Sequence, residues 1–383
     1  MSVTVESPIL TATPLPRGTL EQPRPVGFFE QRWPVVVILG SFLTLTLPVA
    51  VMAATGLDRT ALGTAYVWLF GATHLVLTVT IYCTRANLRH FNSSWRNRTV
   101  FLAVPLGIVL VFGLVHGLRL GAEWPVAIGL LYAVVRLFNF LHLTRQTFGV
   151  YQLFKARAKV KVPAWAKQAE NASGFALVGA LFVTHLSGGW CPLLVAGGPL
   201  SMANLPPLYP AQMSIGWLQL GWVGFVGVAV GLYAAAVRTV PGTGAGLSAR
   251  LYLTGQTLST LAAAVFLPFY LAALAVHYVE YHILMWPRVF RLPLDPTSRL
   301  DRTYGWVRSR PALFYGLLLL IAAGVIGGMD AMMPTEVVGP YSGLLVLFDV
   351  CVVGHYFLEM FIWKFSDPHF RRTLSNLYFA PKG

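Results

Sequence analysis

Long apolar runs recur along almost the whole chain, separated by short polar segments. Each run is long enough to cross the roughly 30 Å hydrocarbon layer of a bilayer as one α-helix. The pattern predicts membrane spans over 33–56, 62–84, 99–118, 124–146, 173–190, 214–237, 311–329 and 341–363. It therefore favours an all-α fold, a polytopic integral membrane helix bundle.

One further apolar block, 251–287, is too long for a single perpendicular helix. Proline opens helices and disrupts their interiors, so we expect this block to break near Pro268. The break gives a short or re-entrant segment over 251–266 and a separate span over 268–286. With it the chain has about ten spans, within a range of about 8–10.

The charged residues refine this picture. Only 11% of the 383 residues are charged and 56% are hydrophobic, which excludes a soluble enzyme, a disordered chain and a disulfide-stapled module. The net charge is +14, and 19 of the 28 Lys and Arg residues lie in 85–98, 155–167, 288–310 and 364–382. Because each stretch follows an apolar run, the excess of base marks a cytoplasmic face and does not indicate nucleic acid as a partner.

This topology divides the chain into three parts. We expect a Pro-rich cytoplasmic tail over 1–32, a single transmembrane domain over 33–363 and a basic cytoplasmic tail over 364–383. Both termini are then cytoplasmic. The predicted location is the inner (plasma) membrane of a bacterium, as a multi-pass protein whose first partner is the lipid bilayer.

Histidines lie deep in several predicted spans, where ionisable residues are costly and often functional. His74 and His277 each precede the next basic cluster by 11 residues, His355 by 9, and His142 precedes Lys155 by 13. At about 1.5 Å per residue, all four imidazoles lie about 13–20 Å from the cytoplasmic ends of their helices. Four histidines at one depth can converge on a common site.

Carboxylates accompany this layer. Glu280 lies three residues after His277, and Glu359 lies four residues after His355, so each shares a helix face with a histidine. Mixed histidine and carboxylate sets with open positions suit non-haem iron. The predicted metal ligands are His74, His142, His277, Glu280, His282, His355 and Glu359.

Two further residues have candidate catalytic roles. Tyr281 is placed to supply a proton or to hold the second nitrogen of a ligand. Arg136 is the only arginine deep in a span, and it either pairs with Asp349 or Glu280 or holds an anionic group of a substrate.

These features favour a membrane-embedded, metal-dependent oxidoreductase that acts on a lipid-like or hydrophobic small molecule. Its cofactor would be one or two metal ions, with iron preferred, and its electrons would come from a membrane donor. Three alternatives stay open: a b-type haem protein linked to quinol, a proton-coupled transporter, and a non-catalytic subunit of a membrane complex. The desaturase-type boxes HxxxH and HxxHH are absent from the sequence.

Overall fold

The structure is a computed structural model, and it describes residues 27–55, 67–117, 124–194, 215–330, 342–363 and 367–379. These residues form helices and connecting turns, with no strands among them and one isolated β-bridge between Trp190 and Phe266. The prediction of an all-α fold is confirmed for this part of the chain.

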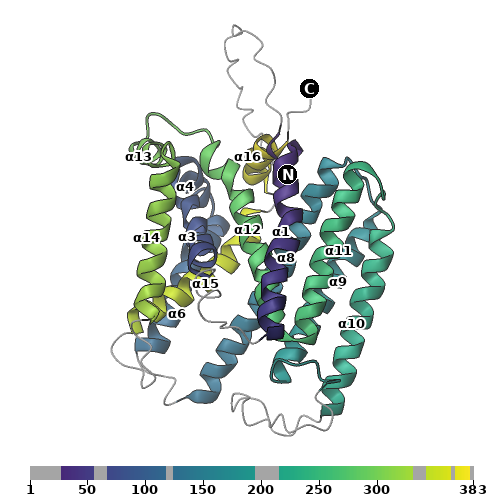
Figure 1. Cartoon of the computed structure of the whole chain (residues 1–383). Helices are drawn as coiled ribbons and strands as arrows, with labels where there is room; N and C mark the ends of the chain where they lie inside the picture. The colour runs from purple at the N-terminus through teal and green to yellow at the C-terminus, as the bar shows by residue number, and fades with distance from the viewer. Residues whose placement is uncertain are drawn as a thin grey trace, which may run out of the picture.

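The long helices stand side by side, and the short helices α4, α13 and α16 lie at one end of them (Figure 1). Their bounds are α1 Arg32–Thr55, α3 Thr73–Val79, α4 Arg85–Phe91, α5 Trp95–Arg98, α6 Val104–Gly117, α8 Pro125–Arg157, α9 Ala164–Leu186, α10 Ile215–Val237, α11 Gly244–Val265, α12 Tyr270–Phe290, α13 Arg299–Arg308, α14 Pro311–Asp330, α15 Ser342–Ile362 and α16 Pro368–Tyr378. Short 3₁₀ turns lie at η1 Phe28–Glu30, η3 Thr80–Cys83 and η6 Leu267–Phe269, and π-helical turns at η2 Val67–Ala72 and η4 Thr99–Ala103.

The apolar block around Pro268 is broken as the proline predicts. Helix α11 ends at Val265, Phe266 adopts an extended conformation, and α12 begins at Tyr270 after the η6 turn. The backbone of Leu267 donates a hydrogen bond to Gly189 O, and that of Cys191 donates one to Val265 O. The break is therefore fixed by the turn that follows α9, and it lets α11 and α12 run as separate helices.

The basic stretch 155–167 is not the simple loop that its charge predicts. Helix α8 continues eleven residues beyond the predicted span end at 146, as far as Arg157, and α9 begins at Ala164. The Lys155 ammonium forms a buried ion pair with Glu170, at 2.6 Å from Oε2. The pair joins the two helices in the part that lies past the apolar window.

The turns at the basic end of the molecule are formed by N-caps that the sequence carries at helix starts. Side-chain oxygens of Thr84, Ser94, Ser298 and Asp367 accept hydrogen bonds from the first free backbone amides of α4, α5, α13 and α16. Such caps satisfy donors that have no partner inside the helix. They fix where α4, α13, α16 and the long segment that starts with α5 begin.

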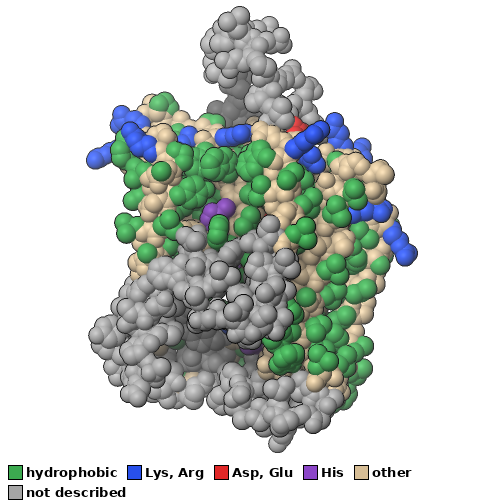
Figure 2. Space-filling view, viewed as in Figure 1, with side chains coloured by type: hydrophobic (Ala, Val, Ile, Leu, Met, Phe, Trp, Pro, Cys, Tyr) green, Lys and Arg blue, Asp and Glu red, His purple; other side chains and the backbone are tan. Residues whose placement is uncertain are grey.

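Within the described residues, two helical segments are long and apolar enough to cross a membrane, Trp95–Val115 and Gly216–Val237. A third is added if α13 and the following Pro311–Gly324 segment, bent by 100°, count as one span. Ten spans are therefore not confirmed. Figure 2 shows Lys and Arg side chains gathered at the end that carries α13 and α16, above a largely apolar flank.

The four predicted layer histidines lie on different helices that touch in the middle of the bundle. Helices α12 and α15 each contact both α3 and α8. One large apolar cluster, which includes Phe28, Tyr151 and Phe370, packs on the basic side of this contact region. A second cluster around Phe140 and Trp222 packs near the α11–α12 break. The histidines are thus enclosed by apolar side chains.

Candidate metal centre

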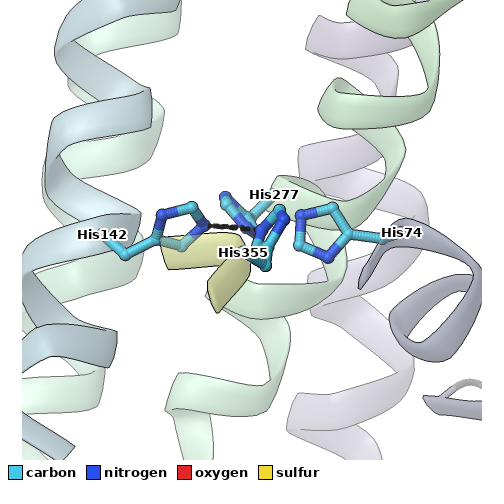
Figure 3. Close-up of side chains that lie close together, drawn as sticks. All are labelled: His74, His142, His277 and His355. Carbon is cyan, nitrogen blue, oxygen red and sulfur yellow. Dashed lines mark hydrogen bonds between the residues drawn. The ribbon is translucent and has the colours of Figure 1, made fainter. Parts of the chain in front are cut away.

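Four imidazoles meet at the centre of the bundle, as Figure 3 shows. They belong to His74 of α3, His142 of α8, His277 of α12 and His355 of α15, and all four residues are buried. One ring nitrogen from each lies within 4.8 Å of those of the other three. We call this group the histidine cluster, and it could hold a metal ion.

The nitrogens of the cluster are not satisfied by one another. His142 Nε2 lies 3.1 Å from His277 Nε2 and 3.2 Å from His355 Nε2. A neutral imidazole nitrogen either donates one proton or accepts one, so His142 Nε2 can form only one of these bonds well. Both ring nitrogens of His74 are buried without a hydrogen-bond partner. A cation that accepts a lone pair from each ring would resolve this conflict.

The spacing of the nitrogens agrees with metal coordination. Imidazole nitrogens bind first-row metals at about 2.0–2.1 Å, so two ligands at angles between about 90° and 110° lie about 2.9–3.4 Å apart. The 3.1 Å and 3.2 Å separations around His142 lie inside that interval. The spacing of His142, His277 and His355 therefore fits one transition-metal ion, and His74 lies beside them.

The second nitrogen of His355 is held by a hydroxyl. His355 Nδ1 and Thr78 Oγ1 share a hydrogen bond of 2.5 Å, and Thr78 Oγ1 shares another of 2.5 Å with the Tyr281 hydroxyl. Such a contact fixes the tautomer of a ligating histidine and leaves Nε2 for the metal. Tyr281 is fully buried, and its ring lies 4.4 Å from that of His74. The predicted catalytic tyrosine thus lies beside the cluster.

Glu359 lies at the edge of the cluster. Its Oε2 is 3.6 Å from His142 Nε2, and Trp363 Nε1 donates a hydrogen bond of 3.3 Å to its Oε1. The Tyr356 ring stacks on His142 at a centroid distance of 4.6 Å. At this distance the Glu359 carboxylate can serve as an additional ligand or balance the charge of a bound cation.

Glu280 points into a separate hydrogen-bond network. Gln256 Nε2 donates to its Oε1 at 2.7 Å, and the Tyr252 hydroxyl donates to its Oε2 at 3.1 Å. Gln146 Nε2 lies 3.5 Å from the same Oε2 and donates to the backbone oxygen of His277 at 3.1 Å. This carboxylate is fully buried but is not part of the metal-ligating group that the structure brings together.

His282 is also outside the cluster. Its Nε2 shares a hydrogen bond with Thr73 Oγ1 at 3.1 Å, and its Nδ1 lies 2.9 Å from the backbone oxygen of Tyr278. His282 follows His277 by five residues, which is about 140° around an α-helix at about 100° per residue. Both nitrogens are therefore engaged, on a face of α12 turned away from the cluster.

Arg136 lies on the exposed surface of α8, six residues before His142. It is within electrostatic range of Tyr270 and Tyr356 and is not among the residues that surround the histidine nitrogens. Its predicted partner Asp349 has a side chain outside the described residues. Its other predicted partner, Glu280, accepts hydrogen bonds from side chains of α8 and α11 and not from Arg136.

Several neighbours of the cluster are not in the predicted site, although the sequence holds signals for them. Thr78 follows His74 by four residues, so it shares that helix face. Gln256 is a polar residue inside the apolar block 251–287, in the part before the break near Pro268. Their roles depend on which helices are neighbours, and that information is not in the spacing along one helix.

Comparison with known proteins identifies no relative: no protein-family model, curated protein or solved structure matches this chain. The function is therefore inferred from the chemistry and geometry of the cluster.

Proposed function

We propose that this chain is a multi-pass membrane oxidoreductase whose histidine cluster binds iron and that acts on a hydrophobic small molecule. The observation that carries the proposal is the convergence of four buried imidazoles from four helices. Three of their Nε2 atoms lie at metal-ligand spacing, and both nitrogens of His74 have no hydrogen-bond partner. Building such a group costs stability, because ring nitrogens of His74 and His277 are buried without hydrogen-bond partners. A bound ion repays that cost.

The packing favours an ion over haem. Ring centroids lie 4.1 Å apart for His74 and His355, and 4.8 Å apart for His142 and His277. Haem ligands stand on opposite faces of a flat macrocycle that is far wider than an imidazole, and rings this close leave no slot for it. Four imidazoles suit Fe, Cu, Zn and Ni, and a neighbouring carboxylate is a hard oxygen donor that suits iron.

The residues of the chain have separate tasks in this proposal. When bound, the iron supplies oxygen activation or polarises an oxygen of the substrate. Glu359 offsets the charge of the cation through its position beside His142. Tyr281 holds a transferable proton. Thr78 Oγ1 hydrogen-bonds both the Tyr281 hydroxyl and His355 Nδ1, and so connects the two residues. The apolar clusters on both sides exclude bulk water.

The surface supports a hydrophobic substrate and a bilayer setting. Large apolar side chains are strongly exposed on several helices, among them Leu43 (76%), Trp217 (70%) and Leu320 (68%). Contiguous apolar surface of this kind marks a membrane or interaction face. Substrate and a membrane electron donor would reach the centre from the lipid phase, and exposed Arg136 is placed to meet an anionic group of such a molecule.

The test uses nitric oxide as a probe of an open iron site. Purified protein in lipid nanodiscs is loaded with Fe(II) without oxygen and exposed to nitric oxide. We expect about one iron per chain and the half-integer-spin EPR signal of an iron–nitrosyl adduct. Stoichiometric zinc that iron cannot displace, or bound iron that gives no adduct, would contradict an oxidoreductase at this site.

A further inference from the structure

A cavity lies between α8, α9 and α11, on the basic side of the histidine cluster. The volume that the centres of water molecules can occupy in it is about 40 Å³. One ordered water needs about 10–15 Å³ on this measure, so the cavity has room for a few. Its wall combines the apolar residues Phe148, Phe175, Leu177 and Leu253 with the polar residues Thr144, Thr147, Ser173, Gln256, Thr257 and Thr260.

Two buried atoms on this wall have no hydrogen-bond partner in the protein. They are Gln256 Oε1 and the Tyr151 hydroxyl, and both residues are at most 1% exposed. An unsatisfied buried polar group costs about 1–3 kcal/mol. Unmet polar atoms behind the wall of a cavity that has room for water favour a hydrated cavity.

The cavity reaches toward the basic end of the molecule. Along α8 its wall extends from Thr144 to Tyr151, about 10 Å at about 1.5 Å per residue. At this end it is bounded by Glu170, whose carboxylate accepts hydrogen bonds from Lys155 Nζ and Gln152 Nε2. Arg145, which is exposed and hydrogen-bonded to Asn171, lies on the same wall.

At the other end, a chain of hydroxyls leads to Glu280. Thr147 lines the cavity, and its side chain lies close to the Tyr252 hydroxyl. Tyr252 donates in turn to Glu280 Oε2, while Gln256 from the cavity wall donates to Oε1. Glu280 lies one helical turn from His277, and Gln146 bridges the two.

We propose that this cavity and hydroxyl chain form a proton path from the basic end of the molecule, past Glu170, to Glu280 beside the histidine cluster. Each water or hydroxyl along the path accepts one proton and passes on another, so none keeps a net charge, and the Glu280 carboxylate takes up the proton. The proposal rests on the proposed function in one respect only: the reaction at the metal site would consume the delivered proton.

The experiment follows hydrogen–deuterium exchange at the Glu280 carboxyl by infrared spectroscopy. Full-length protein as purified is held in lipid nanodiscs at about pH 5, and the buffer is changed to D₂O. The protonated Glu280 band is identified as the carboxyl band that Glu280→Gln removes. We expect it to exchange roughly ten times more slowly in Thr257→Leu, which fills the cavity, and in Thr147→Val, which breaks the hydroxyl chain.

The matched control is Thr254→Val, on the same helix as Thr257. Thr254 shares a hydrogen bond with Tyr233 and does not line the cavity, so this variant should exchange like the wild type. If Glu280→Gln removes no carboxyl band, the proposal is overturned. Equal exchange rates in the wild type and Thr147→Val would also overturn it. The readout does not need a bound metal, so failure of the metal proposal leaves it intact.

Discussion

At the scale of single residues, His142 is the hub of the cluster. Its Nε2 faces His277, His355 and Glu359 at 3.1 Å, 3.2 Å and 3.6 Å. One nitrogen cannot bond to three partners through a single proton or lone pair. The arrangement makes physical sense when the partners share an ion, and it makes the neighbouring carboxylate part of the site's charge balance.

We therefore expect Glu359→Gln to weaken metal binding by about 10–100-fold, the usual effect of removing a residue that supports metal ligands. The amide keeps the size of the side chain and can still meet Trp363, but it removes the negative charge. Competition with a coloured chelator measures the affinity. Glu359→Asp, which keeps the charge, should lose less. An unchanged affinity in Glu359→Gln would show that Glu359 is only structural.

At the scale of elements, α8 and α9 are joined at the basic end by one buried ion pair. Lys155 Nζ lies 2.8 Å and 2.6 Å from the two oxygens of Glu170, and it also lies over the Tyr151 ring. A buried charge that loses its partner is strongly destabilising, whereas an apolar pair of similar volume is often tolerated.

Lys155→Met is accordingly expected to reduce the free energy of unfolding by about 3–5 kcal/mol. The double variant Lys155→Met with Glu170→Leu should recover most of that loss, because no uncompensated charge remains. Thermal unfolding of Lys155→Met, Glu170→Leu and the double variant in the same detergent is the measurement. If the double variant is as unstable as the two single changes added together, the ion pair is not coupled as described.

Helix α16 is attached to α4 through a histidine pair whose charge matters. The His90 and His369 rings stack at 4.2 Å, and His369 Nε2 shares a hydrogen bond with Asn87 Oδ1 at 3.0 Å. Burial, followed by repulsion from His90, lowers the pKa of His369 to about 4, although Asp367 opposes this shift. The packed helix therefore prefers the neutral ring.

Because the folded-state pKa lies below the ordinary value of about 6.5, protonation favours release of α16. The attachment should be complete above about pH 6.5 and weaken as the pH falls toward about 4. Amide hydrogen exchange of the α16 peptide across this range measures the release. His369→Gln should flatten the dependence; equal pH dependence in this variant would assign it to another group.

The sequence predicts the helices of this fold better than it predicts which helices pack against one another. The Pro268 break follows from the chemistry of proline, and the common depth of His74, His142, His277 and His355 follows from counting residues to the next basic cluster. The apolar pattern does not predict the extension of α8 to Arg157, because it ends where polar residues begin, and the Lys155–Glu170 pair depends on which helix lies next to α8. The Tyr252 and Gln256 contacts depend on α11 packing against α12 in the same way.

At the scale of the whole molecule, the separation of charge from apolar surface predicts its place in the cell. Lys and Arg gather at one end, and large apolar side chains are exposed on the flank (Figure 2). We expect the expressed protein to stay in the membrane fraction after an alkaline wash and to leave it only with detergent. Release by the wash would contradict an integral position.

The central claim is that the histidine cluster binds a metal ion, and metal content per chain tests it most directly. Protein purified without added metal, from the wild type, His142→Ala and His282→Ala, is measured by elemental mass spectrometry. We predict about one transition-metal ion per chain in the wild type and in His282→Ala, whose nitrogens are engaged elsewhere, and almost none in His142→Ala. A wild type without metal, or full occupancy in His142→Ala, would contradict the claim.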